Sequence, residues 1–148
     1  MKTENAEMDE NSRVLFICRH NAGRSQIAEA LLKKMTGGKL AVESAGFSPA
    51  SAVNPLVATV MQEQGIDLSG KKPQSVFELF KQGRIYTHVI TVCDDSESDC
   101  PIYPGIARRL HHPFPDPAKV EGSEEEKLAR VREIRDLIKQ WLEQQVSE

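Results

Sequence analysis

The sequence has little of what marks several large classes of proteins. Its net charge of −3 at pH 7 gives no global indication of binding to nucleic acid or to an anionic membrane. No apolar run approaches the ~20 residues of a membrane-spanning helix. Residues 1–12 are polar and acidic, unlike a signal peptide, and we expect a frayed or disordered tail. Without repeats, linkers or low-complexity tracts, residues 13–148 are expected to form a single domain.

Cysteine is also scarce, because the chain has only Cys18, Cys93 and Cys100. An odd number without a signal sequence argues against a structural disulfide framework and favours a reduced, cytoplasmic protein. No Cys-x2-Cys pair is present, and the adjacent His111 and His112 do not naturally converge on one ion. We therefore expect no metal centre built on cysteine and histidine.

Short apolar runs alternate with segments of helical periodicity along the chain. The expected strands cover residues 13–18, 39–46 and 87–93, with a short fourth strand within 106–114. The expected helices begin at Arg24, after an N-cap at Asn54, and at capping boxes opened by Ser75 and Ser123. This alternation predicts an α/β fold with a four-stranded parallel sheet and helices on both faces.

The first expected strand ends at Cys18, and the loop RHNAG leads from it to a helix that begins with Arg24. The N–H groups of such a loop form a nest for a tetrahedral oxyanion, and an arginine can hold two of its oxygens. The same positive field favours the thiolate of Cys18, to which Ser25 can donate a hydrogen bond. The stretch predicts a nucleophile inside an anion-binding loop, and the alternative is a buried, inert cysteine. The expected oxyanion-binding residues are Arg19, His20, Asn21, Ala22, Gly23 and Arg24.

Asp116 lies in a proline-stiffened loop, PFPDPA, that follows the last expected strand. If this loop reaches the carboxyl edge of the sheet, the Asp116 carboxyl can donate a proton to a leaving oxygen. The simpler alternative is an ordinary Asp-Pro turn.

Cys93 ends the third expected strand, and Cys100 follows after six polar or acidic residues. Such a segment can bring Cys100 to Cys93, and Cys93 to Cys18, only if it moves, because a disulfide needs Cα atoms within about 7 Å. The alternative is that both cysteines are incidental thiols.

Three motifs together resemble the low-molecular-weight protein tyrosine phosphatases and their relatives, the thioredoxin-coupled arsenate reductases. The motifs are CRHNAGRS at residues 18–25, SAGF at 44–47 and PFPDPA at 113–118. The resemblance implies a flavodoxin-like three-layer fold with Asp116 as the general acid.

Cys93-x6-Cys100 followed by proline resembles the redox segment of the arsenate reductases. In that family three cysteines form a relay. Carried over, Cys18 attacks arsenate, Cys93 attacks Cys18 as arsenite leaves, and Cys100 then resolves the Cys18–Cys93 disulfide. A thioredoxin-type donor reduces the resulting Cys93–Cys100 disulfide, and the implied role is arsenical resistance.

The chain departs from these families in several positions. Gly23 replaces a cysteine outside the relay, and RHNAG resembles a subgroup in which some members use a low-molecular-weight thiol. Ala118 and Lys119 replace the paired tyrosines of many phosphatases, which weakens the case for an aryl phosphate pocket. Some members bind potassium beside the loop, and the matching positions here are Asn21, Glu29 and Ser44, with Gln74 in place of an acidic fourth ligand.

Three functions therefore stay open: a cytoplasmic arsenate reductase, a phosphomonoester hydrolase that uses Cys18, Arg24 and Asp116, and a non-enzymatic oxyanion or redox sensor. We expect a monomer without a tightly bound cofactor and without nucleic-acid or membrane partners. The reductant is expected to be thioredoxin or a thiol such as glutathione or mycothiol.

Overall fold

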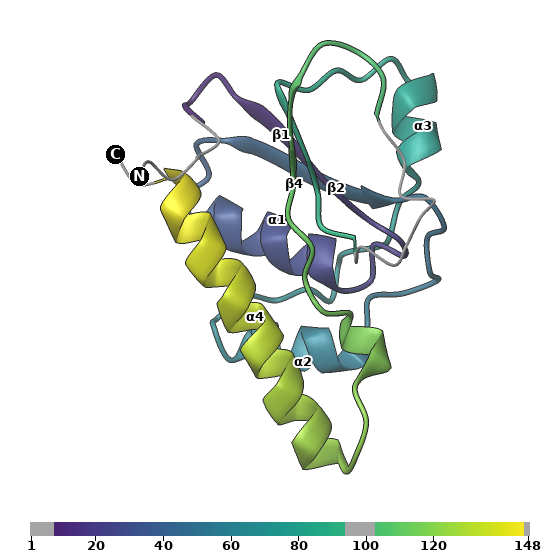
Figure 1. Cartoon of the computed structure of the whole chain (residues 1–148), viewed down its shortest axis with the longest axis vertical. Coiled ribbons are helices and arrows are strands. Elements are labelled where there is room, and N and C mark those ends of the chain that lie inside the picture. Colours follow the sequence, from purple (N-terminus) through teal and green to yellow (C-terminus); the bar gives the residue numbers. More distant parts are fainter. Residues whose placement is uncertain (1–7, 94–102, 147–148) are drawn as a thin grey trace.

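The computed structural model describes residues 8–93 and 103–146, which contain four strands, four α-helices and one short 3-10 helix (Figure 1). The strands are β1 (Arg13–Cys18), β2 (Ala41–Gly46), β3 (His88–Thr91) and β4 (Arg108–His111). The helices are α1 (Arg24–Met35), α2 (Pro55–Gln62), α3 (Val76–Lys81) and α4 (Glu124–Val146), with the 3-10 helix η1 (Pro117–Lys119). Each described helix is too short or too polar to span a bilayer.

The four strands form one parallel sheet in the order β2-β1-β3-β4. The central strand β1 is buried almost throughout, as its continuous apolar sequence predicts. Its side chains alternate between two cores: Val14, Phe16 and Cys18 face one side, and Leu15 and Ile17 face the other. Cys18 therefore emerges from the centre of the sheet at its carboxyl edge.

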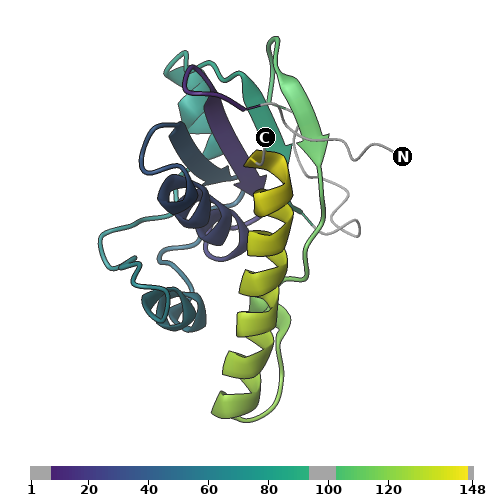
Figure 2. The ribbon, with the colours of Figure 1, turned by 90° about the vertical axis from the view of Figure 1, so that its left-hand side faces the viewer.

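Helices cover both faces of the sheet, which confirms the predicted architecture. Residues of α1, α2 and α4 share the larger core with Val14 and Phe16, and α3 packs on the opposite face with Leu15 and Ile17. Figure 2 shows α4 as a long rod that crosses one side of the molecule beside α1. Arg135 fastens α4 to α2, since its guanidinium donates to the Val60 carbonyl at 2.8 Å and to the Glu63 carboxylate at 2.9 Å.

Most of the predicted helix starts are confirmed by their caps. The Asn54 side chain accepts a hydrogen bond from the Leu56 N–H, and the Ser75 side chain accepts from two backbone N–H groups of α3. Ser123 and Glu126 bond reciprocally, which is the capping box expected before α4.

Three segments differ from the expectation. β2 begins at Ala41, two residues after the start predicted for that strand. β3 ends at Thr91 rather than at Cys93, although the Val92 N–H still donates to the Ile17 carbonyl at 2.9 Å. The loop before α4 contains η1, which Asp116 caps by accepting from the Ala118 N–H at 2.9 Å. The three-residue η1 is too short to give a periodic apolar signal.

The end of β2 lies directly against the loop that follows β1. A Cβ atom added to Gly46 would stand 2.7 Å from the Arg19 carbonyl oxygen and 2.9 Å from the Asn21 nitrogen. Both neighbours are backbone atoms that cannot rotate away. Only a glycine at this position allows the loop to rest on the sheet.

We expect Gly46→Ala to displace this loop and to lower the free energy of unfolding by roughly 1–3 kcal/mol, the usual cost of overpacking. Gly70→Ala is the matched control, because a Cβ there meets nothing within 4 Å. Urea denaturation of both variants measures the difference. Equal stability of the two variants would show that the loop yields without strain.

Candidate active site

The loop of residues 19–23 and the start of α1 enclose a cavity of about 30 Å³ at the carboxyl edge of β1. It is lined by Cys18, His20, Ala22, Gly23, Arg24, Asn54, Asp116 and Ala118. Three separate segments thus meet at one small hollow, with a thiol, a guanidinium and a carboxyl group around it. Its small size suits a compact ligand.

The Cys18 sulfur receives hydrogen bonds from two sides. The Asn21 N–H donates to Sγ at 3.3 Å, and the Ser25 Oγ lies 2.8 Å from Sγ. Because the Ser25 oxygen already accepts from the Asn21 Nδ2 at 2.7 Å, its own hydrogen is available for the sulfur. Donors aimed at sulfur stabilise a thiolate, which is the nucleophilic form of cysteine.

Asn21 holds the loop in its shape. It is the only non-glycine residue with a positive φ among those described, at 52°, a conformation that asparagine tolerates better than most residues. Its Oδ1 accepts from the Gln26 Nε2 at 3.2 Å and from the Gln74 N–H at 2.9 Å, and its Nδ2 donates to Ser25 and to the Ser44 Oγ. These bonds fix which end of the amide points to which partner.

The loop carbonyls bond to the segment that follows β2. The carbonyl oxygens of Arg19, His20 and Ala22 accept from the N–H groups of Ser48, Ala50 and Asn54 at 2.8–3.0 Å. These oxygens are committed to backbone partners, which lessens their repulsion of an anion in the cavity.

Arg24 and Asp116 meet at the mouth of the cavity. The buried Arg24 donates to the Phe114 carbonyl at 3.3 Å, and its other terminal nitrogen lies 3.6 Å from the Asp116 Oδ2. One oxygen of Asp116 caps η1, so the second is directed by that cap toward the guanidinium. This geometry places the Asp116 carboxyl and the Arg24 guanidinium side by side in the lining of the cavity.

The side chains of Arg19 and His20 have different surroundings. The Arg19 guanidinium lies over the Phe47 ring, 5.3 Å from its centroid, so Arg19 contributes its backbone to the loop. The His20 Nδ1 donates to the Ser48 carbonyl at 2.9 Å, since a carbonyl oxygen can only accept. Gly23 packs against Pro117, to which an added Cβ would approach within 3.1 Å.

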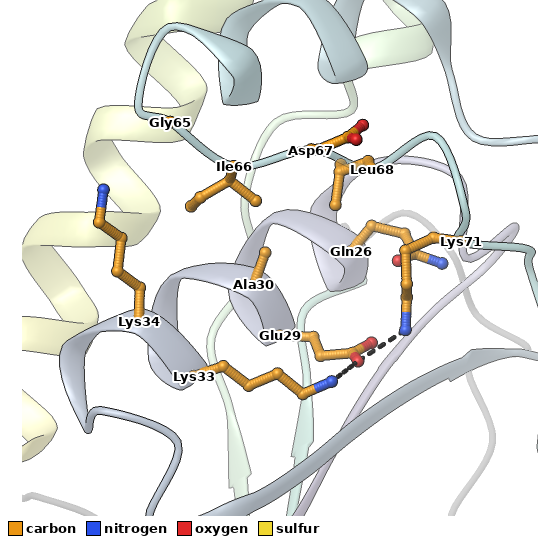
Figure 3. A pocket seen from close by; sticks show the side chains of 10 residues that line it. All are labelled: Gln26, Glu29, Ala30, Lys33, Lys34, Gly65, Ile66, Asp67, Leu68 and Lys71. Carbon is orange, nitrogen blue, oxygen red and sulfur yellow. Dashed lines mark hydrogen bonds and ion pairs between the residues drawn. The ribbon is translucent and has the colours of Figure 1, made fainter.

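Glu29 lies behind the loop and is neutralised by two lysines (Figure 3). The Nζ atoms of Lys33 and Lys71 both lie 2.7 Å from its Oε2, and the Ser44 Oγ donates to its Oε1 at 2.6 Å. Burial alone would raise the pKa of Glu29, but these hydrogen bonds outweigh it and hold the pKa below the ordinary value of 4.5.

These contacts do not fit a potassium ion at the positions predicted from the sequence. The Glu29 carboxylate already has two ammonium partners. The Asn21 side chain turns its Nδ2 group toward Ser44, and an N–H donor cannot coordinate a cation. The Gln74 side chain donates to the Ser44 carbonyl at 2.9 Å. Among the described residues, no group of three or more His, Cys, Asp and Glu side chains is arranged to hold a metal ion.

Cys93 is fully buried, with its sulfur 3.8 Å from the carbonyl oxygen of Ile17, the residue before Cys18. Cys93 is disulfide-bonded, whereas Cys18 is a free thiol. The predicted role of Cys100 lies outside the described residues.

Sequence reasoning missed two residues that shape the site. Gln26 donates to the Asn21 carbonyl at 3.0 Å from one turn into α1, and Asn54 lines the cavity. Gln26 follows directly after the loop motif, so its position near the loop could be inferred from the sequence. The N-cap pattern of Asn54 identified a helix start but gave no indication of what that start faces.

A comparison with protein families places this geometry among known proteins. A model of the family described as low molecular weight phosphotyrosine protein phosphatase matches residues 13–148. The chain belongs to this family. The match confirms the resemblance that the three motifs indicate, and it covers every strand and helix described above.

Relatives within the family are named arsenate reductases. The protein from Halalkalibacterium halodurans is 40% identical over 130 residues, which make up 86% of this chain and 91% of that protein. The solved structure of the Archaeoglobus fulgidus arsenate reductase is 33% identical with a TM-score of 0.62, and the match covers 85% of this chain and 98% of that one. The thioredoxin-dependent arsenate reductase of Corynebacterium glutamicum is 36% identical with a TM-score of 0.58, over 90% of this chain and 63% of that one.

The lowered pKa of Glu29 predicts a loss of stability in acid. Because the unfolded chain binds a proton at this carboxyl at higher pH than the folded protein does, the stabilisation is present above about pH 4.5 and is lost as the pH falls below it. Glu29→Gln should lower the free energy of unfolding at pH 7 by roughly 1–3 kcal/mol, and the deficit should shrink in acid.

Urea denaturation from pH 7 to pH 3 measures this deficit. Glu78→Gln is the control, because Glu78 is an exposed carboxylate with a single lysine 3.5 Å away. Its removal should change stability little at any pH. A deficit for Glu29→Gln that does not vary with pH would contradict the assignment.

Proposed function

We propose that this protein reduces arsenate to arsenite, with Cys18 as the nucleophile and Cys93 and Cys100 as the resolving thiols. The observation that supports this most directly is that one cysteine lines a small cavity and a second cysteine contacts the backbone of the residue before it. Cys18 lines that cavity, and the Cys93 sulfur lies next to the residue that precedes Cys18. A hydrolase of this family would need the first sulfur but not the second.

The first step forms a bond between sulfur and arsenic. The Cys18 thiolate attacks As(V) of arsenate held by the loop N–H groups and Arg24, and one arsenate oxygen leaves as water after protonation by Asp116. The contacts of Ser25 and Asn21 favour the thiolate before attack. The positions of Arg24 and Asp116 around the cavity support these roles.

The second step transfers the electrons. The Cys93 thiolate attacks the Cys18 sulfur, a Cys18–Cys93 disulfide forms, and the electron pair of the sulfur–arsenic bond passes to arsenic, which leaves as arsenite, As(III). Cys100 then attacks the Cys93 sulfur, which releases the Cys18 thiolate and leaves a Cys93–Cys100 disulfide. A disulfide-bonded Cys93 together with a free Cys18 is the combination expected at this point.

A dithiol donor must return two electrons for each arsenate reduced. We propose thioredoxin, because a relative of 36% identity is named as thioredoxin-dependent, and a low-molecular-weight thiol is the alternative donor. We also propose that the protein acts as a monomer in the cytoplasm.

Phosphomonoester hydrolysis is the second candidate, favoured by the family and by Asp116 beside Arg24. Ala118 forms part of the cavity lining, where the family's phosphatases often place an aromatic side chain. A methyl group there offers an aryl ester little stacking surface. Slow hydrolysis of an aryl phosphate is therefore compatible with the site as a side activity.

The roles of the three cysteines can be separated in single-turnover reactions. Cys18→Ser should abolish arsenite formation, because a serine hydroxyl is a much weaker nucleophile than a cysteine sulfur. Cys93→Ser should release no arsenite. Cys100→Ser should release one equivalent and then stall as a Cys18–Cys93 disulfide.

The measurement mixes each reduced variant with one equivalent of arsenate, quantifies arsenite and maps disulfides by mass spectrometry after thiol blocking. Hydrolysis of p-nitrophenyl phosphate, if detectable in the wild type, is the control and should survive the changes at Cys93 and Cys100. Free cycling of the Cys100 variant with thioredoxin would show that Cys93 is reduced directly. Wild-type behaviour of both resolving variants would leave hydrolysis as the function.

We further propose that turnover requires no potassium, because the ammonium groups of Lys33 and Lys71 already balance Glu29. The rate should be the same in KCl and NaCl at equal ionic strength. Lys71→Met should reduce the rate, because Glu29 loses one of two cations and its link through Ser44 to Asn21 weakens. Lys81→Met is the control at an exposed pair. A wild-type enzyme activated severalfold by potassium would contradict this proposal.

A further inference from the structure

We propose that the side-chain amide of Asn54 donates a hydrogen bond to the bound oxyanion, as a binding residue outside the loop of residues 19–23. The inference rests on the proposed function and adds to it, because Asn54 belongs to a segment that the phosphate-loop motif does not include. Asn54 lines the same small cavity as Cys18 and Arg24.

The orientation of the amide follows from its other bonds. The Asn54 Oδ1 accepts from the Leu56 N–H at 2.8 Å as the N-cap of α2, so the oxygen end is committed to the helix. Within the described residues, the Nδ2 group makes no hydrogen bond. An amide with its oxygen engaged offers only N–H groups on its other side. Asn54 therefore brings an uncommitted donor to a cavity built for an anion.

The backbone of Asn54 fixes this donor relative to the loop. Its N–H donates to the Ala22 carbonyl at 2.9 Å, and Pro55 follows it at the first position of α2. The capped, proline-restrained segment and the loop are thus held together before any ligand arrives. A donor positioned in advance stabilises charge without the cost of reorganisation.

The chemistry also suits a tetrahedral ligand. Arg24 and the loop N–H groups supply donors from the segment that follows Cys18, and Asp116 supplies a proton at one oxygen in the proposed mechanism. Asn54 adds a neutral donor from a different segment, so that it can reach an oxygen that the loop does not enclose. Inorganic phosphate and arsenate share this shape and charge, and both should bind through the contact.

Two substitutions separate this role from helix capping. Asparagine, aspartate and serine cap helices about equally well, so Asn54→Ser and Asn54→Asp should both preserve α2. The serine side chain is shorter and has no amide N–H to reach the bound anion. Aspartate has a negatively charged oxygen in place of the amide nitrogen. We expect phosphate affinity to fall about tenfold in Asn54→Ser and at least about a hundredfold in Asn54→Asp.

Isothermal titration calorimetry of the reduced protein with inorganic phosphate measures these affinities, and thermal unfolding followed by circular dichroism verifies the cap. Thr59→Ser, an exposed change within α2, is the control and should bind phosphate like the wild type. The order wild type, Asn54→Ser, Asn54→Asp in decreasing affinity supports the proposal. Wild-type affinity in both Asn54 variants, or an equal loss in both, would overturn it.

The titration does not depend on reduction of arsenate. If the wild type binds phosphate but forms no arsenite, the proposed function fails while the ranking of the Asn54 variants still decides this inference. Where the reductase is active, KM for arsenate should follow the same ranking as the phosphate affinity.

Discussion

The hydrogen bonds of one buried amide, that of Asn21, hold the candidate site together. Through it the loop after β1 is joined to α1 at Ser25 and Gln26, to β2 at Ser44, and to the backbone of Gln74. The same residue has a positive φ, and its backbone N–H donates to the Cys18 sulfur. Removing this amide would take a hydrogen-bond partner from four residues on three segments, which is costlier than losing a single bond.

The Asn21 amide is linked through Ser44 to a cluster of charged side chains around Glu29. The Glu29 carboxylate accepts from Ser44, and two lysines balance it from the solvent side. The Cys18 sulfur is thereby connected through Ser25, Asn21 and Ser44 to an ion cluster at the surface of α1. The same arrangement explains why a carboxylate is tolerated in a mostly buried position, since each of its oxygens has a donor.

The sequence predicted the parts of the site that depend on local chemistry. A buried strand that ends at Cys18, a short polar loop and Arg24 at a helix start are all adjacent in the chain, and the helix caps at Asn54 and Ser123 have recognisable patterns. The contacts that complete the site are not local. Lys71 meets Glu29 from 42 residues away, and Gln74 meets Asn21 from 53 residues away. No periodicity marks such pairs, because they arise only when the sheet and its connections have packed. The end of β3 at Thr91 was missed for a related reason: pairing with β4 stops there, although the apolar run continues to Cys93.

The way in which α4 packs has a consequence for how the site comes apart. This helix contacts both α1, which supplies Arg24, and α2, whose cap is Asn54, and it follows directly on the segment of Asp116. The segments that line the cavity are therefore all in contact with, or connected to, the 23-residue helix α4, which packs in the larger core. A substitution that loosens α4 would therefore disturb Arg24, Asn54 and Asp116 together, although none of the three residues belongs to α4.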